Sequence, residues 1–278
     1  LSDRVTAIVP FGDDYFDTLL NNAQQFTQNI LTFGERDVSL ADAGVDMQQA
    51  KEIGLTDEDT VLLMGDVFAD DVEVGNTSTF SLNFNFDIDE IESQNVSLNF
   101  AGEHNISNAL AAAACAQALG LSIDDIAKGL DAAKPAKGRL NFIEFGRHTL
   151  IDDTYNANPS AVIAATQVLV SQGAPTMLVL GDIGELGDAA QEEHRKLGEA
   201  IAASGVTVLY TVGELTPVTV AQAQASGMQA QAYPDKATLL AAIKDKLTSS
   251  DDAWHILFKG SRYMRMEQII DELTRQPF

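Results

Sequence analysis

The sequence contains a single cysteine, Cys115, so the chain cannot form a disulfide within itself. It has no apolar run of 18 residues, and without one no membrane-spanning helix is predicted. Its first residues lack the basic and apolar pattern of a secretory signal peptide. These absences indicate a cytoplasmic protein that does not insert into membranes, and Leu1 in place of Met hints at a fragment.

Basic residues are also scarce. The chain of 278 residues carries 17 Lys and Arg against 41 Asp and Glu, which gives a formal net charge of −24. Nucleic acids and anionic membrane surfaces are bound through clusters of basic side chains, so both are excluded as unaided partners. A small anionic substrate is compatible with the sequence only where a few bases converge.

Several catalytic and binding motifs are missing from the sequence. There is no G-x-x-x-x-G-K-[ST] phosphate loop and no G-x-G-x-x-G after a strand, which argues against nicotinamide chemistry. There is no C-x-x-C and no H-E-x-x-H, and the four histidines are scattered, so no zinc site is predicted. We expect no metal ligands in this sequence.

The composition is that of a folded protein, with 45% hydrophobic and 21% charged residues. Charge is distributed unevenly: residues 1–136 hold 24 acids and 5 bases, whereas residues 137–278 hold 17 acids and 12 bases. A Pro and a Gly lie close together at Pro135 and Gly138, as in a linker. We therefore predict two domains, 1–137 and 138–278.

The first half mixes strands and helices. Alternation of apolar and polar residues over 80–86 and 96–100 predicts strands that have one solvated face and are neighbours in an antiparallel sheet. Shorter apolar runs at 5–9 and 61–64 predict further strands. Helices are expected over about 104–118 and 124–133, the second capped by Ser122.

The second half alternates strands and helices, which predicts a parallel sheet flanked by helices. The expected strands are 149–152, 177–180, 206–212, 229–233 and 254–258, and the expected helices are about 160–170, 189–203, 216–225, 236–247 and 262–273. Ligands of such sheets bind at the carboxyl ends of the strands. The candidate functional loops are therefore the segments that follow the strands, 152–158, 181–187, 213–214 and 259–262.

The segment Gly102–Asn108 precedes or opens a helix. Asn105 and Asn108 are three residues apart and should share one face of that helix. An Asn amide donates and accepts hydrogen bonds together, which suits the edge of an adenine ring. A polar helix N-terminus without a ligand is the commoner origin of such a pattern.

The loop from Asp152 to Ser160 is unusually polar. Its two carboxylates could bind ribose hydroxyls or a metal, and Tyr155 could stack on a base. The alternative is a capped turn, in which Asn158 or Ser160 is the N-cap and Pro159 presets the backbone. The sequence alone leaves these two interpretations evenly balanced.

Two bases, Lys259 and Arg262, lie three residues apart at a predicted strand end. With a helix N-terminus below them they would form an anion site, although a solvated turn has the same pattern. Arg139, beside the predicted linker, is another candidate for binding phosphate. The glycine-rich segment Gly181–Gly187 lets a backbone approach a ligand, and a structural role is equally compatible with it.

The chain resembles the Mur ligase family of cell-wall synthesis in several segments taken together and in this order. They are the pattern G-x-H-N-x-x-N at 102–108, the Gly-Arg-Leu at 138–140, and the three strand-end loops at 152–159, 181–187 and 259–262. The forms of the three loops resemble the member that joins D-alanyl-D-alanine to a UDP-N-acetylmuramoyl-tripeptide. The resemblance implies an α/β fold, in which part of a central ATPase-type domain (1–137) precedes a Rossmann-like parallel-sheet C-terminal domain (138–278).

The resemblance also implies a reaction and a cofactor. ATP phosphorylates the carboxylate of the tripeptide nucleotide, the amine of D-alanyl-D-alanine attacks the acyl phosphate, and Mg²⁺ offsets the charge. The resemblance implies that adenine is contacted by Asn105 and Asn108, with His104 beside them. It implies that Arg139 reaches the terminal phosphate of ATP and that Asp153 binds the ribose, with Tyr155 and Asn156 nearby. Lys259 and Arg262 are assigned to the dipeptide carboxylate on chemical grounds.

The family's phosphate loop, metal-binding side chains and uridine-nucleotide domain have no counterpart in this sequence. We therefore expect the carboxy-terminal portion of a monomeric enzyme, which is inactive alone. Two alternatives stay open at this point. One is a ligase similar to folylpolyglutamate synthase, against which the Asp152–Pro159 loop speaks, and the other is a nucleotide-binding module without catalytic activity.

Overall fold

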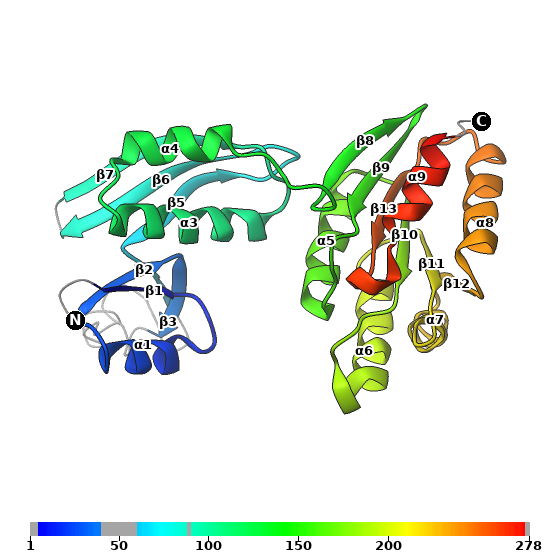
Figure 1. Cartoon of the computed structure of the whole chain (residues 1–278), viewed down its shortest axis with the longest axis horizontal. Coiled ribbons are helices and arrows are strands. Elements are labelled where there is room, and N and C mark those ends of the chain that lie inside the picture. Colours follow the sequence, from blue (N-terminus) through cyan, green and yellow to red (C-terminus); the bar gives the residue numbers. More distant parts are fainter. Residues whose placement is uncertain (1–4, 40–59, 88–89, 276–278) are drawn as a thin grey trace, which may run out of the picture. The chain divides into compact units, whose positions relative to one another are not determined.

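The computed structural model describes residues 5–39, 60–87 and 90–275, which fold as two compact units, Leu1–Lys134 and Pro135–Phe278 (Figure 1). Each unit has its own sheet and its own hydrophobic core. The α/β fold implied by the sequence is therefore confirmed.

The first unit is built on a five-stranded sheet in the order β1-β2-β5-β6-β7. Its strands are β1 (Thr6–Pro10), β2 (Asn29–Phe33), β5 (Val67–Glu73), β6 (Ser78–Asp87) and β7 (Glu90–Leu98). The first three are parallel, and β6 pairs antiparallel with both β5 and β7, as the alternating residues predicted. Strands β3 (Glu35–Ser39) and β4 (Thr60–Met64) form a separate antiparallel pair.

Three helices of this unit are described: α1 (Phe16–Gln24), α3 (Glu103–Ala118) and α4 (Ile123–Ala132). Helices α3 and α4 bury their apolar faces against the inward side chains of β6 and β7, among them Leu82, Phe84 and Val96. Ser122 caps α4 by accepting a hydrogen bond from the amide of Asp125, as predicted. The sequence patterns did not predict α1, β2, β3 or β5.

The second unit is built on a six-stranded sheet in the order β12-β11-β10-β13-β9-β8. Its strands are β8 (Asn141–Phe145), β9 (His148–Asp153), β10 (Thr176–Gly181), β11 (Val208–Val212), β12 (Gln229–Tyr233) and β13 (His255–Lys259). All neighbours are parallel except β8 and β9. The five strands predicted for this half are found, and β8 is an additional edge strand that the sequence interpretation missed.

Helices cover both faces of this sheet (Figure 1). They are α5 (Pro159–Ser171), α6 (Ala190–Ala203), α7 (Thr216–Ala225), α8 (Lys236–Thr248) and α9 (Glu267–Arg275). Strand order advances from β9 through β10 and β11 to β12 and then returns to β13, so right-handed crossovers place α5, α6 and α7 on one face and α8 on the other. Helices α8 and α9 pack together on that second face.

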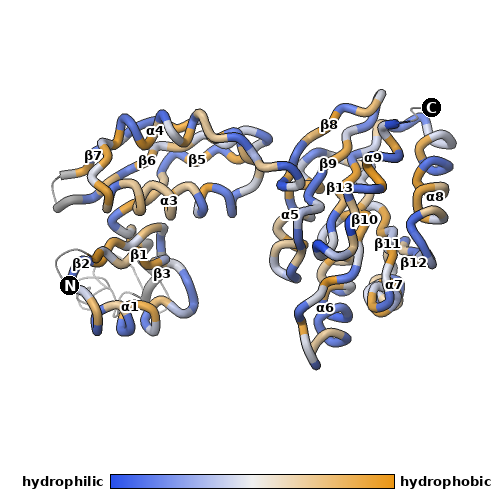
Figure 2. Tube along the Cα trace, in the orientation of Figure 1, coloured by the Kyte–Doolittle hydropathy of each residue, from blue (hydrophilic) through white to orange (hydrophobic). Residues whose placement is uncertain are grey.

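The central strands of this sheet are hydrophobic along their length because both of their faces are covered (Figure 2). Leu178, Leu180 and Leu257 are fully buried. Polar side chains are concentrated at the carboxyl ends of the strands, where Asp153, Asp182 and Lys259 are also buried. The candidate loops therefore extend from strand ends that are buried in the core.

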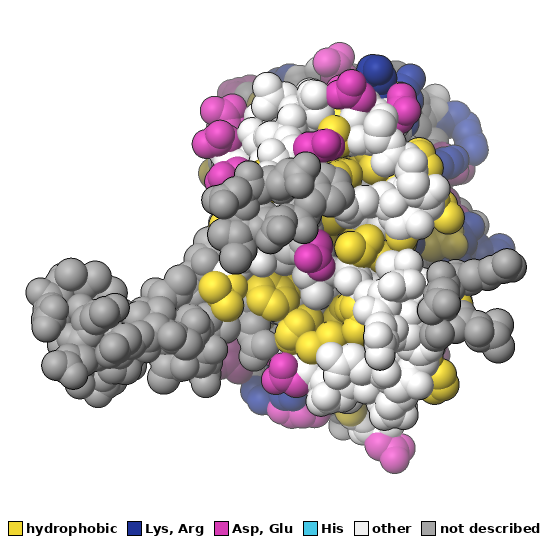
Figure 3. Space-filling view, turned by 90° about the vertical axis from the view of Figure 1, so that its left-hand side faces the viewer, with side chains coloured by type: hydrophobic (Ala, Val, Ile, Leu, Met, Phe, Trp, Pro, Cys, Tyr) yellow, Lys and Arg dark blue, Asp and Glu magenta, His cyan; other side chains and the backbone are white. Residues whose placement is uncertain are grey.

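The surface of the first unit carries exposed apolar side chains, among them Phe26 and Leu119. Figure 3 shows hydrophobic side chains gathered on one face, with acidic side chains around them. Among the residues that the structure describes, no helix is both long and apolar enough to cross a membrane.

Candidate functional site

A cleft of about 800 Å³ opens at the carboxyl edge of the second sheet. It is lined from the loop after β9 by Asn156 and Ala157, from the loop after β10 by Gly184 and Glu185, and from the segment after β13 by Ser261, Arg262, Tyr263, Arg265, Glu267, Gln268 and Asp271. Three of the four loops that the sequence singled out therefore meet in one place, whereas Gly213 and Glu214 are not among the lining residues.

The topology of the sheet explains the position of the cleft. Strands β10 and β13 are neighbours, but the chain leaves β10 toward α6 on one face and leaves β13 toward α9 on the other. The two loops diverge at this point and leave a crevice between them. Open α/β sheets bind their ligands at such a switch in strand order.

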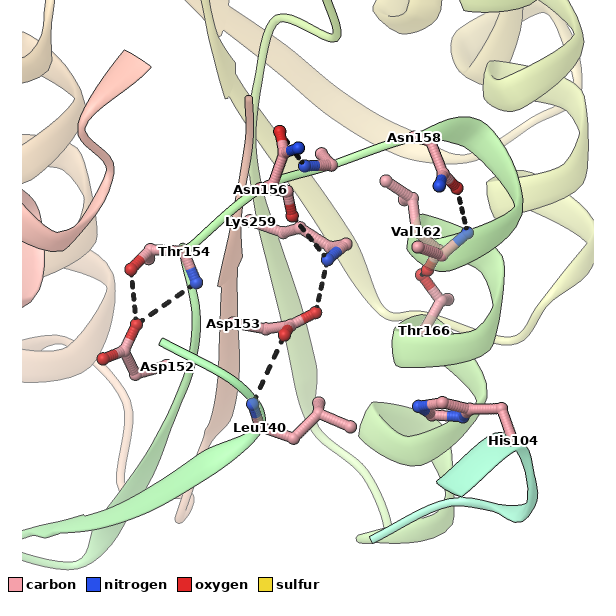
Figure 4. A network of polar contacts seen from close by, with 12 residues as sticks. His104, Leu140, Asp152, Asp153, Thr154, Asn156, Asn158, Val162, Thr166 and Lys259 are labelled. Carbon is pink, nitrogen blue, oxygen red and sulfur yellow. Dashed lines mark hydrogen bonds and ion pairs between the residues drawn. The ribbon is translucent and has the colours of Figure 1, made fainter. Parts of the chain in front are cut away.

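A buried ion pair forms the floor of this region. Lys259 and Asp153 are opposite each other in the parallel register of β13 and β9, so their side chains lie on the same face of the sheet. The ammonium of Lys259 donates to Asp153 Oδ2 at 2.5 Å and to the Asn156 carbonyl at 3.0 Å (Figure 4). The backbone amide of Leu140 donates to Asp153 Oδ1 at 3.3 Å.

Both partners of this pair are withdrawn from solvent, with Lys259 2% and Asp153 6% exposed. Burial raises the pKa of the Asp153 carboxyl above its usual value, and the Lys259 ammonium and the Leu140 amide oppose that shift. The contacts of Asp153 are thus made within the chain, on both carboxylate oxygens.

Lys259 and Arg262, which the sequence offered together as one anion site, are separated in the structure. Lys259 is buried against Asp153, whereas the Arg262 side chain is 60% exposed and lies on the cleft, where it pairs with Glu267 at 3.1 Å. The reason is the strand geometry. Lys259 is the last residue of β13, and its side chain lies on the same face of the sheet as that of Asp153 in β9. Arg262 lies beyond the strand, where it begins the 3₁₀ helix η3 (Arg262–Met264).

The helix expected from Arg262 onward also begins later than predicted. After η3 the backbone turns through Arg265 in the left-handed conformation (φ +48°), and α9 starts at Glu267. This break turns Arg262, Tyr263 and Arg265 toward the cleft instead of building them into a regular helix.

The loop after β9 is organised largely by its own hydrogen bonds. The Asp152 carboxylate accepts from the Thr154 hydroxyl at 2.6 Å and from the Thr154 amide at 3.2 Å. Asn158 caps α5 by accepting from the Ala161 amide at 2.7 Å, with Pro159 in the first helical position, so the capped turn is confirmed. Asn156 is exposed at the cleft.

Arg139 and Tyr155 form a stacked pair on this unit. The guanidinium carbon of Arg139 lies 4.4 Å from the centre of the Tyr155 ring, and both side chains are exposed. Gly138 makes the approach feasible because it has φ +77° and a Cβ at that position would lie 3.0 Å from the Tyr155 amide nitrogen. A cation–π contact of this kind orients the guanidinium before any ligand binds.

The loop after β10 is tied down by a buried carboxylate. Asp182 accepts hydrogen bonds from the amides of Glu214, Leu215 and Thr216 at 2.7–3.0 Å, and so satisfies the N-terminus of α7. Gly213 faces this carboxylate so closely that a Cβ would lie 2.1 Å from Asp182 Oδ1. The role of Asp182 is therefore structural. The sequence left a structural role and a ligand-binding role equally open for this loop.

Two further side chains hold the same loop, and sequence reasoning missed both roles. His194 is fully buried on α6, where Nε2 accepts from the Ile183 amide at 3.3 Å and Nδ1 lies 2.8 Å from the Ala190 carbonyl. Ser261 Oγ accepts from the Gly184 amide at 2.8 Å. The only signal for His194 was a His on the apolar side of a predicted helix, which does not reveal its partner.

On the first unit, Asn105 and Asn108 lie side by side on α3, as their spacing predicted. Asn108 Nδ2 donates to Asn105 Oδ1 at 3.2 Å, and Asn105 Nδ2 lies 2.7 Å from the Ala101 carbonyl and 3.3 Å from His104 Nε2. A smaller cleft of about 420 Å³ lies beside the same helix, where Glu103, Ile106, Ser107 and Leu110 line it. His104, Asn105 and Asn108 are not among its lining residues.

A metal site is not found within residues 5–39, 60–87 and 90–275, where no group of three His, Cys, Asp or Glu side chains could hold an ion. The carboxylates of Asp152 and Asp153, which the sequence offered as metal ligands, are engaged by Thr154 and Lys259. Both carboxylates therefore already have a partner within the chain.

Two family models match the chain. The Mur ligase middle domain matches residues 1–116, and the glutamate ligase domain of Mur ligases matches residues 138–262. The chain belongs to the Mur ligase family. The two matched regions fall in the two units of the structure and together leave few residues unmatched.

Among curated Mur ligases, the chain is 38% identical over 182 residues to the UDP-N-acetylmuramoyl-tripeptide–D-alanyl-D-alanine ligase of Escherichia coli and 35% identical over 182 residues to that of Bacillus subtilis. These alignments cover 65% and 63% of this chain. The chain spans 39% of the length of each of these relatives.

Solved structures of Mur ligases resemble this chain over nearly its whole length. A crystal structure of MurF from Acinetobacter baumannii is 36% identical, with a TM-score of 0.79 over 98% of this chain and 52% of that one. MurF from Thermotoga maritima, solved in complex with ADP, has a TM-score of 0.67 at 21% identity over 98% of this chain and 53% of that one, and shows the fold alone.

Proposed function

We propose that the chain is part of an ATP-dependent ligase that joins D-alanyl-D-alanine to the UDP-N-acetylmuramoyl-tripeptide through an acyl phosphate, in peptidoglycan precursor synthesis. One observation carries this proposal: the three strand-end loops that resemble this member of the family converge on one cleft, which they reach at Asn156, Gly184 and Ser261. The names of the relatives support it.

Arg262 is the residue proposed to bind the carboxylate of the dipeptide. Its guanidinium is exposed on the cleft, where it pairs with the carboxylate of Glu267. Guanidinium groups bind carboxylates through two parallel hydrogen bonds. Lys259 is proposed as a positioning residue instead, because its contacts hold Asp153 and the Asn156 carbonyl in place.

ATP contacts are proposed separately on the two units. On the first unit, Asn105 and Asn108 lie on one face of α3 beside His104, Asn105 half-buried and Asn108 exposed, and their amide groups suit an adenine edge. On the second unit, Arg139 is presented over Tyr155 for a phosphate group, with Asn156 and Tyr155 exposed for the ribose. ATP supplies the phosphoryl group that activates the carboxylate when it is bound.

The chain alone is proposed to be inactive, because its sequence contains no Lys-bearing phosphate loop and its described residues hold no metal cluster. Phosphate release by the purified chain, with every substrate and Mg²⁺ supplied, should stay at background. We also propose a monomer that works in the cytoplasm, where ATP is available.

A second candidate, a ligase similar to folylpolyglutamate synthase, is favoured only by fold. The folylpolyglutamate synthase of Thermotoga maritima has a TM-score of 0.55 at 17% identity over 100% of this chain and 56% of that one. The two functions differ in the amine that the cleft takes. D-Alanyl-D-alanine and glutamate, titrated separately into the chain by calorimetry, distinguish them.

The experiment compares the wild-type chain with R262A and with R275A as a matched control. Arg275 is also an exposed arginine of this region and pairs with Glu272, outside the cleft. Loss of a charge-assisted contact costs about 1.5–3 kcal/mol, or about 10- to 150-fold in affinity. R262A should lose D-alanyl-D-alanine binding by that factor, and R275A should bind within about twofold of wild type. Preferential binding of glutamate, or equal binding by R262A, would contradict the proposal.

A further inference from the structure

The cleft of the second unit carries charges of both signs. Arg262 and Arg265 line it together with Glu185, Glu267 and Asp271. In a chain with a net charge of −24, a site for a simple cation needs no arginines, and a site for a simple anion gains nothing from three carboxylates. A lining with both signs is suited to a molecule that itself carries both, such as an amino acid or a short peptide.

One of these carboxylates is incompletely satisfied. Glu267, in the first turn of α9, is only 19% exposed at its side chain. Its Oε1 contacts Arg262 at 3.1 Å, whereas Oε2 is shielded from solvent and has no hydrogen-bond partner among the described residues. A buried acceptor without a donor costs free energy, which a ligand with N–H groups can recover.

The chain's own nearby ammonium does not fill this role. Lys236 acts electrostatically on Glu267, but its Nζ donates to the Arg265 carbonyl at 3.1 Å and to Gln268 Oε1 at 2.9 Å. Glu267 therefore has one oxygen on Arg262 and one buried oxygen without a donor among the described residues.

We propose that Glu267 is a specificity-determining residue that binds the ammonium group of a zwitterionic peptide, while Arg262 binds its carboxylate. The inference rests on the proposed function for the identity of the dipeptide. When the zwitterion binds, its carboxylate replaces Glu267 on Arg262, and its ammonium takes the carboxylate that has been released. The Arg262–Glu267 pair thus keeps each group oriented until both ends of the substrate are present.

This arrangement predicts opposite effects of one substitution on two ligands. E267Q removes the partner of the ammonium and also frees Arg262. Binding of D-alanyl-D-alanine should weaken about tenfold or more, whereas N-acetyl-D-alanyl-D-alanine, which has no ammonium, should bind unchanged or more tightly. A residue that only supports the fold would weaken both ligands equally.

The test measures both ligands by calorimetry on the wild-type chain, on E267Q and on E272Q. Glu272 is the matched control because it lies on the same helix and pairs with Arg275 at the surface. Wild type and E272Q should prefer the free dipeptide at least about tenfold over the acetylated one, and E267Q should lose that preference.

Three other outcomes are informative. If wild type binds both peptides equally, or if E267Q weakens both, the role of Glu267 is overturned while the proposed function stands. If wild type does not bind D-alanyl-D-alanine but binds glycylglycine in a manner that depends on Glu267, the inference stands and the proposed function falls. If wild type binds no zwitterionic peptide, both are overturned.

Discussion

The pair formed by Lys259 and Asp153 shows how a residue that resembles a ligand-binding base can be part of the interior. Both charges are buried and each is the other's ionic partner. Removing one partner of a buried pair leaves an uncompensated charge, which costs about 3–5 kcal/mol, whereas replacing both by apolar residues is often close to neutral.

We therefore expect K259M to lower the free energy of unfolding of the second unit by about 3–5 kcal/mol. The double variant D153L/K259M should recover most of that loss, because no charge is then left unpaired. Urea denaturation monitored by circular dichroism measures both. A K259M chain as stable as wild type would show that the ion pair contributes nothing to the fold.

His148 makes the stability of the same unit depend on pH. Its Nδ1 accepts a hydrogen bond from the Trp254 amide at 3.1 Å, which requires the neutral imidazole. Burial, and to a lesser extent Arg147, lowers the pKa of His148 below its ordinary value. The unfolded chain therefore binds a proton that the folded chain rejects, and stability falls as the pH decreases below about 6.5.

The contribution of His148 is isolated by comparing wild type with H148N, since the Asn oxygen can accept the same hydrogen bond without titrating. The stability difference between the two proteins should shift against wild type between pH 7.5 and 5.5. Thermal melts over this range measure the shift. Parallel pH profiles for the two proteins would rule out His148 as the titrating group.

At the level of elements, the loop after β10 and the start of α7 form one unit. Asp182 accepts three amide hydrogen bonds across this junction. Replacing a side chain that caps a helix costs about 0.5–2 kcal/mol, and leaving buried amides unsatisfied adds to that cost.

We expect D182A to destabilise the second unit by about 2–4 kcal/mol, with the loss concentrated at this junction. Hydrogen exchange of the Glu214, Leu215 and Thr216 amides should accelerate far more than exchange in β9. D188A, an exposed substitution in the same loop, is the control and should leave these amides unchanged. Uniform acceleration throughout the unit would indicate a general loss of stability instead.

The elements that could be predicted from the sequence are those whose pattern is local. The strands β10, β11 and β13 are continuous apolar runs, and Ser122 and Asn158 lie where helix caps are expected. Strand β8 was not predicted, because it lies directly after the segment interpreted as a linker and pairs with β9 across a short turn. The burial of Lys259 against Asp153 could not be predicted, because it depends on the register between β13 and β9, and no local sequence pattern determines that register.

At the level of the whole chain, the two units differ in charge as well as in fold. The second unit has a large core shared by the strands and the helices on one face. A length of about 140 residues is enough to bury an independent core.

We propose that residues 135–278 fold without the rest of the chain. A subclone of these residues should give a cooperative melt, and a subclone without one would place the boundary elsewhere.

The most direct measurement is a titration of the isotopically labelled chain with D-alanyl-D-alanine, followed by nuclear magnetic resonance of the backbone amides. The proposed function predicts saturable shifts concentrated on the amides that line the cleft, Gly184, Glu185, Ser261 and Arg262, with little change in β12 or α8. Shifts on the first unit alone, or no shifts at millimolar dipeptide, would contradict the assignment of this cleft to the amine substrate.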